Sequence, residues 1–153
     1  MSTICRLSTA VLLLLGSACS DSEQQATADR QQIQSLLEEY LPKLSEAYAS
    51  GTSWHLRGLA AEKEMAAVEK GLKEVARGGR QIQATFHGLT IEDVTSWGHA
   101  NAYVTTLETW TVALYTSDGK HELSVEERRD RVRYQLKREG DSWLVLYRQR
   151  QDT

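Results

Sequence analysis

Cysteine is scarce in this sequence of 153 residues, which contains only Cys5 and Cys19. Cys5 lies in a hydrophobic N-terminal segment that we expect to be removed, so the mature chain is expected to have no internal disulfide bond. The histidines stand alone rather than at metal-ligand spacings, and we interpret them as exposed or hydrogen-bonded structural residues. They are His55, His87, His99 and His121. We therefore expect neither a metal site nor a cofactor.

An excess of positive charge is also lacking, because 18 Lys and Arg residues face 21 Asp and Glu residues, for a net charge of −3. This balance argues against a nucleic-acid-binding protein, which would show a dense basic surface. The most hydrophobic segment, Leu7 to Leu15, is far shorter than the roughly 20 residues that span a bilayer. It is therefore not expected to be a transmembrane helix.

The same segment fits a bacterial lipoprotein signal. Arg6 precedes it, and Gly16-Ser17-Ala18-Cys19 follows it. A basic residue, a short apolar run and small residues before a cleavage site are typical of a secretory signal peptide. The small residues with the cysteine resemble the lipobox, after which the cysteine is acylated. We expect residues 1–18 to be a signal peptide and Cys19 to carry lipid, with an ordinary secreted protein as the alternative.

Residues 20–30 contain no large apolar side chain. They predict a flexible tether, residues 19–30, between the lipidated Cys19 and a single domain of residues 31–153. A serine directly after the cysteine, here Ser20, resembles the outer-membrane sorting pattern of enterobacterial lipoproteins. We therefore expect a lipid-anchored protein of the bacterial cell envelope, on the periplasmic side of the outer membrane.

Two helical regions are predicted next. Apolar residues recur at steps of three and four over 33–48, which indicates an amphipathic helix. The only proline, Pro42, lies inside this pattern and is expected to kink or divide the helix near Leu41. Over residues 54–78, a short helix is expected to run into a longer one that ends at two glycines.

Beyond Gly79 the apolar pattern alternates, which predicts strands. The first strand is expected to carry a bulge or bend at Gly88, where the alternation changes parity. Three further strands are predicted over about 100–115, 127–137 and 142–148. Helices followed by an antiparallel meander indicate the α+β class.

Several stretches of these strands carry a family resemblance: Leu89-Thr90-Ile91, Val94, Ala102–Trp110, Val132–Leu136 and Gly140–Val145. They resemble the nuclear transport factor 2-like superfamily, and within it most of all the IMS domain known from chloroplast division proteins and from bacterial proteins. The resemblance implies a cone-like fold, in which N-terminal helices pack in the concave face of a curved antiparallel sheet. The superfamily includes isomerases and dehydratases, whereas IMS-type domains look like binding or assembly modules.

The candidate pocket residues are Glu108, Trp110, Arg128, Asp130 and Tyr134. Glu108 lies on the predicted core-facing side of its strand, and a carboxylate there must be paired or must line a cavity. Arg128 and Asp130 lie on the same predicted face of the next strand as Tyr134. We predict a Glu108–Arg128 ion pair, with a ligand-binding carboxylate and a general base as alternatives.

Arg129, Arg131 and Arg133 alternate onto the opposite face of that strand and form a candidate basic surface. We interpret them as a charged outer face that discourages edge pairing, with contact to anionic lipid or an acidic partner as the alternative. Trp97 is expected in a turn, where it either packs locally or serves as a contact residue.

These observations favour a membrane-anchored, non-catalytic module that binds a protein or a small ligand in the concavity of the sheet. Its expected partners are the membrane, through the lipid, and an envelope protein; a homodimer is also considered. The alternative is an isomerase- or dehydratase-type enzyme with Glu108 as base. No catalytic residue is expected, because Tyr103 lies on the opposite strand face from Glu108 and no oxyanion donor is fixed against it.

Overall fold

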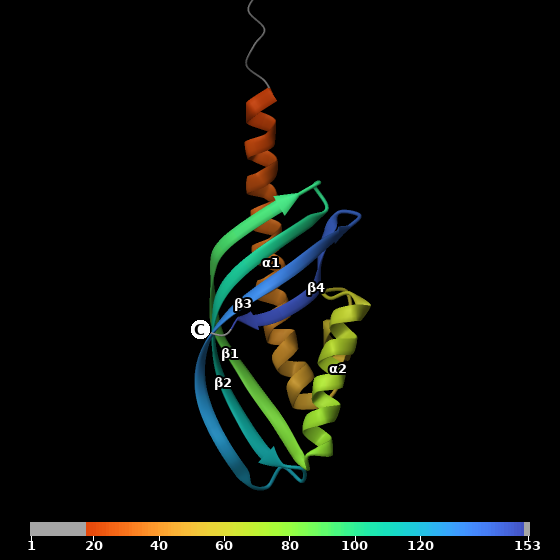
Figure 1. Cartoon of the computed structure of the whole chain (residues 1–153), viewed down its shortest axis with the longest axis vertical. Coiled ribbons are helices and arrows are strands. Elements are labelled where there is room, and N and C mark those ends of the chain that lie inside the picture. The colour runs from red at the N-terminus through yellow and green to blue at the C-terminus, as the bar shows by residue number, and fades with distance from the viewer. Residues whose placement is uncertain (1–17, 152–153) are drawn as a thin grey trace, which may run out of the picture.

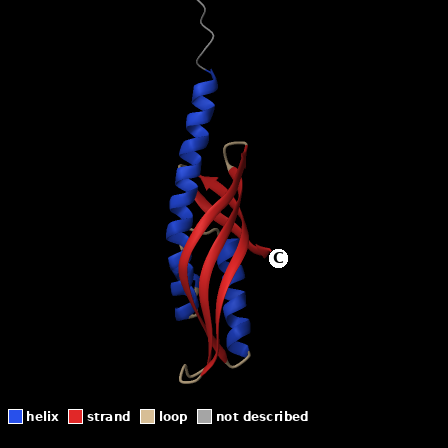
Figure 2. Ribbon diagram, turned by 90° about the vertical axis from the view of Figure 1, so that its left-hand side faces the viewer, coloured by secondary structure: helices blue, strands red, loops and turns tan. Residues whose placement is uncertain are grey.

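The computed structural model describes residues 18–151 and contains three helical segments followed by four strands. The helical segments are α1 (Ala18–Ser50), the short 3₁₀ helix η1 (Ser53–Leu56) and α2 (Glu62–Arg77). The strands are β1 (Arg80–Trp97), β2 (Asn101–Thr116), β3 (Glu122–Glu139) and β4 (Ser142–Gln151). The predicted α+β class and element order are confirmed. Both α1 and α2 lie against the curved sheet (Figures 1 and 2).

The sheet is a meander in which each strand pairs antiparallel with the next, in the order β1-β2-β3-β4. The register of β1 shifts between Phe86 and Gly88, which confirms the predicted bulge, and shifts again between Ile91 and Asp93. In β2 the even-numbered residues from Ala102 to Trp110 are buried and face the helices. A bulge increases local twist, so these shifts help the long strands to curve around a helix.

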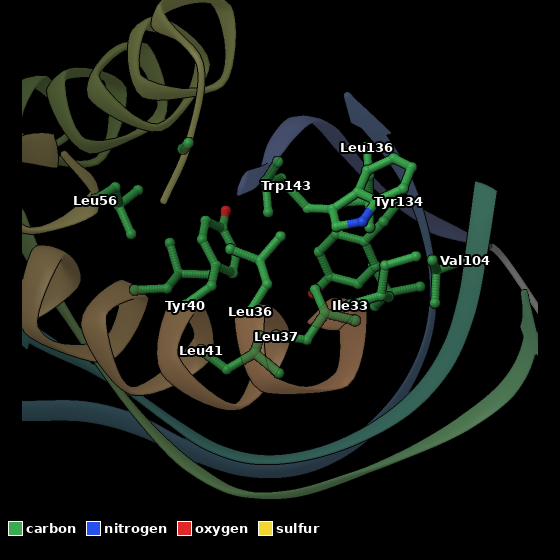
Figure 3. Packing of buried hydrophobic residues seen from close by; sticks show 14 of the residues in the cluster. Ile33, Leu36, Leu37, Tyr40, Leu41, Leu56, Val104, Tyr134, Leu136 and Trp143 are labelled. Atoms are coloured by element: carbon green, nitrogen blue, oxygen red, sulfur yellow. The ribbon is translucent and has the colours of Figure 1, made fainter. Parts of the chain in front are cut away.

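Helix α1 fills the concave side of the sheet with one apolar stripe, and Figure 3 shows this stripe facing the buried side chains of the strands. Its fully buried members are Ile33, Leu37, Tyr40, Leu41, Leu44 and Ala47. The ring of Tyr40 meets the ring of Tyr134 edge to face, with centroids 6.2 Å apart. This end of the cone is therefore packed.

The expectation of a flexible tether is wrong for the described residues, because α1 is continuous from Ala18 to Ser50. Asp29 is only 4% exposed and accepts a hydrogen bond of 2.6 Å from Arg138 at the end of β3. Gln25 donates a second hydrogen bond to the same carboxylate. The helix continues N-terminal to these contacts, where alanine, glutamate and glutamine favour helix formation. This N-terminal part of α1 projects beyond the sheet (Figure 1).

Pro42 lies inside α1 without dividing it. Its neighbours Leu41 and Leu44 are both fully buried against the sheet. Tertiary packing of this kind outweighs the hydrogen bond that proline removes.

Residues 1–17, which hold most of the expected signal peptide, lie outside the described residues, as does the side chain of Cys19. Along the part of the chain that is described, no helix is both long and apolar enough to cross a membrane.

Candidate functional site

Glu108 is fully buried in the concave face of the sheet, and both of its oxygens are occupied. Oε1 accepts hydrogen bonds from the hydroxyls of Thr106 (2.9 Å) and Tyr134 (2.5 Å). Oε2 accepts from Trp110 Nε1 (2.9 Å) and from Arg148 Nη2 (2.9 Å). A carboxylate has about four acceptor sites, so this set of donors saturates it.

The partner of Glu108 is Arg148, and the predicted pair with Arg128 is wrong. Arg128 instead pairs with Asp130 on its own strand, at 3.3 Å. Arg148 lies opposite Tyr134 in the β3–β4 register, and its Nε donates to the Tyr134 hydroxyl at 3.1 Å. Arg148 lies on β4 and Glu108 on β2, with β3 between them. The observed ion pair therefore spans three strands, whereas the predicted pair with Arg128 would have joined only β2 and β3.

Arg148 was missed because a bulge changes the parity of β4. Leu136 pairs with Val145, but the preceding residue, Gln135, pairs with Tyr147. Strict alternation from the buried Trp143 and Val145 would have placed Arg148 outside. The extra residue turns Arg148 inward, and no pattern in the sequence marks that irregularity.

A second buried carboxylate, Glu64 of α2, lies on the other side of Arg148 and was not anticipated. Its Oε1 accepts a hydrogen bond of 2.8 Å from the Tyr40 hydroxyl, and its Oε2 accepts one of 3.2 Å from the backbone N–H of Arg148. Burial raises the pKa of Glu64, and these hydrogen bonds only partly oppose that shift. This residue ties α2 to both α1 and the edge strand β4.

The hydroxyl donors keep their protons at neutral pH. Burial raises the pKa of Tyr134 well above its usual value of 10.0, and the same cause acts on Tyr40, where Glu64 adds to it. Burial works to lower the pKa of Arg148, but its electrostatic interactions with Tyr134 and Glu108 outweigh this and hold that pKa well above its usual value. The cluster is therefore a buried ion pair with neutral tyrosine donors.

Two cavities open beside this cluster and meet at Tyr48, Ile82 and Arg148. The helix-side cavity, of about 290 Å³, lies between α1, α2 and β1. The sheet-side cavity, of about 320 Å³, lies over the concave face of the strands. Three of the five predicted pocket residues line the latter, namely Trp110, Arg128 and Asp130. Glu108 and Tyr134 line neither cavity, because they lie behind Arg148.

This arrangement is suited to binding rather than to proton transfer. A general base needs a lone pair directed at the substrate, and every acceptor site of Glu108 is engaged by protein donors. Within residues 18–151, no group of His, Cys, Asp and Glu side chains is placed to hold a metal ion. Among residues 18–151, the polar groups that line the cavities without a hydrogen-bond partner in the protein include the Tyr48 hydroxyl and one edge of the Arg148 guanidinium.

The pH dependence of stability should report on Glu64. Because its pKa is higher in the folded than in the unfolded chain, the folded protein keeps a proton that the unfolded chain has lost. The free energy of unfolding should therefore fall as the pH rises from about 4.5 through the folded pKa. Glu64→Gln removes the titrating group while its amide oxygen can still accept a hydrogen bond from one of the two donors, so it should flatten this fall in urea denaturation across that pH range. An equally steep fall in the variant would contradict the role given to Glu64.

The candidate basic surface lies on the convex face of β3, as predicted, with all three arginines exposed. Arg131 forms an ion pair of 2.8 Å with Glu92, and Arg133 stacks over the ring of Tyr103. Trp97 ends β1 and is 42% exposed, with its ring 4.8 Å from that of Tyr103. It packs locally and still presents part of its surface to solvent.

Several solved structures share this fold. The intermembrane space region of the chloroplast protein ARC6 superposes with a TM-score of 0.68 at 13% identity, over 80% of this chain and 96% of that one. A scytalone dehydratase-like protein from Novosphingobium aromaticivorans gives 0.54 at 12% identity, over 86% and 88%. A periplasmic fragment of TraM gives 0.55 at 9% identity, over 81% and 98%.

Identities this low show a common fold only. The expected nuclear transport factor 2-like cone is therefore confirmed, and so is the structural similarity to an IMS region. Neither a protein-family model nor a curated protein sequence matches this chain.

Proposed function

We propose that this protein is a lipid-anchored binding module of the bacterial cell envelope that holds a small ligand in its cone without transforming it. The observation that carries the proposal is the contrast between Glu108, whose oxygens are saturated, and the two cavities beside it. The hydrogen bonds and the ion pair around Glu108 stabilise the sheet, and the cavities provide space for a ligand.

The continuity of helix α1 supports the envelope part of the proposal. Lipid on Cys19 would connect to the cone through a continuous helix, because α1 begins at Ala18. At 1.5 Å per residue, the part of α1 that precedes its first fully buried residue, Ile33, spans about 20 Å. A stiff connection of that length would hold the cavities at a set height above the membrane, where a partner protein in the envelope could reach them.

The enzyme alternative has a relative in fold, the scytalone dehydratase-like protein. It requires Glu108 as base, and that carboxylate has no free acceptor site and does not line either cavity. The binding function is therefore the better supported of the two.

The proposal is tested by extracting the full-length protein from envelopes under mild conditions and recording native mass spectra. We expect wild type to carry a co-purifying small molecule and the lipid mass. Cys19→Ser should lose the lipid mass, and Gly71→Phe should lose the small molecule, because Gly71 lines the helix-side cavity and an added Cβ there meets open space. Wild type without lipid would contradict the anchor, and wild type without any bound molecule would contradict ligand binding.

A further inference from the structure

The two cavities differ in chemistry, and the difference bears on which ligand they suit. The helix-side cavity is largely apolar, with walls that include Leu44, Val68, Leu72, Val75 and Ile82. Apolar walls of this kind stabilise a hydrocarbon group by removing it from water. Its charged lining residues are Glu64 and Arg148.

The sheet-side cavity is lined by cationic groups. Arg128, Arg148 and Arg150 line it, against one carboxylate, Asp130. The side chains of Arg128 and Arg148 are 23% and 18% exposed, so both are partly desolvated, which strengthens their interaction with an anion. If Glu108, which lies behind Arg148, is counted as well, three arginines face two carboxylates at this cavity, so positive charge is in excess.

Arg148 also has donor capacity that the protein leaves unused. Its Nε and Nη2 donate to Tyr134 and Glu108. Among residues 18–151, no acceptor takes a hydrogen bond from its Nη1. Arg148 itself is among the residues shared by the walls of both cavities. A guanidinium with unused donors beside a cavity suits the oxygens of a carboxylate or a phosphate.

We propose that the ligand is a small anionic amphiphile, with a carboxylate or phosphate group between Arg128 and Arg148 and a short hydrocarbon chain in the helix-side cavity. This inference rests on the proposed binding function and names the ligand class. The two cavities lie at the lower end of the 300–1,000 Å³ that is usual for ligand pockets, so a chain of about ten carbons suits them better than a bulky lipid.

The test uses isothermal titration calorimetry on the full chain carrying Cys19→Ser, which avoids detergent. The probes share one chain and differ in head group: decanoate, decyl phosphate, decanol and decyltrimethylammonium. We expect at least one anion to bind, decanol to bind about tenfold more weakly or worse, and the cation not to bind. The two anions distinguish a carboxylate from a phosphate ligand.

Variants separate the head-group site from the chain site. Arg128→Gln should weaken the anion about tenfold and leave decanol unchanged, whereas Arg133→Gln, on the convex face of the same strand, should change neither. Gly71→Phe should abolish binding of the anions and of decanol while the protein stays folded. Decanol binding as tightly as the anions, or tight binding of the cation, would overturn the anionic class and leave the binding function standing. If wild type binds no probe, the amphiphile is overturned, and the native mass spectra decide separately whether any ligand is held.

Discussion

Replacing Arg148 with methionine is expected to lower the free energy of unfolding by about 3–5 kcal/mol, because it leaves the buried carboxylate of Glu108 without its counter-ion. Methionine preserves most of the apolar stem, so the loss measures charge rather than packing. Glu108 would keep the donors from Thr106, Tyr134 and Trp110, but neutral donors do not replace a charge in a buried site. Urea denaturation followed by circular dichroism gives the difference directly.

Two further variants make that result specific. Arg131→Met breaks the exposed ion pair with Glu92 on the convex face and should cost no more than about 1 kcal/mol. Adding Glu108→Gln to Arg148→Met removes the stranded charge and should recover part of the loss, which a double-mutant cycle would record as coupling. Equal costs for Arg148→Met and Arg131→Met would show that the buried pair does not hold the sheet.

Truncating Leu37 to alanine is expected to cost about 2–5 kcal/mol, the range for a fully buried leucine whose site cannot collapse. Leu37 lies in the centre of the α1 stripe that the strands enclose (Figure 3). The neighbouring Glu38 is exposed on the same helix, so Glu38→Ala should stay within about 0.5 kcal/mol of wild type. A small cost at Leu37 would mean that α1 is not the core element of the cone.

Residues that follow a simple period could be placed from the sequence. The alternation along β2 correctly put Glu108 and Trp110 on the inner face, and the change of parity at Gly88 correctly marked a bulge. The arginine stripe on β3 was likewise placed on the outer face. In each case the local pattern and the tertiary environment agree.

Residues whose positions depend on distant contacts could not be placed in this way. The partner of Glu108 depends on a bulge in β4, forty residues along the chain. The segment that was expected to be a flexible tether is helical, and its contact with the sheet depends on the pairing of Asp29 with Arg138, which lies 109 residues further along the chain. Glu64 lies in an acidic helix start, where its sequence context is that of a solvent-exposed residue. Its burial follows only from the packing of α2 against β4.

The claim that the Glu108 cluster stabilises the fold while the cavities bind the ligand is tested most directly by measuring stability and decyl-anion affinity on the same two variants. Glu108→Gln should lose about 1–3 kcal/mol of stability, since an amide cannot accept from all four donors, and should bind the decyl anion that wild type binds, decanoate or decyl phosphate, at least as tightly as wild type does. Gly71→Phe should keep its stability and lose binding of that anion. The opposite pattern, with Glu108→Gln stable but unable to bind and Gly71→Phe binding normally, would contradict the claim.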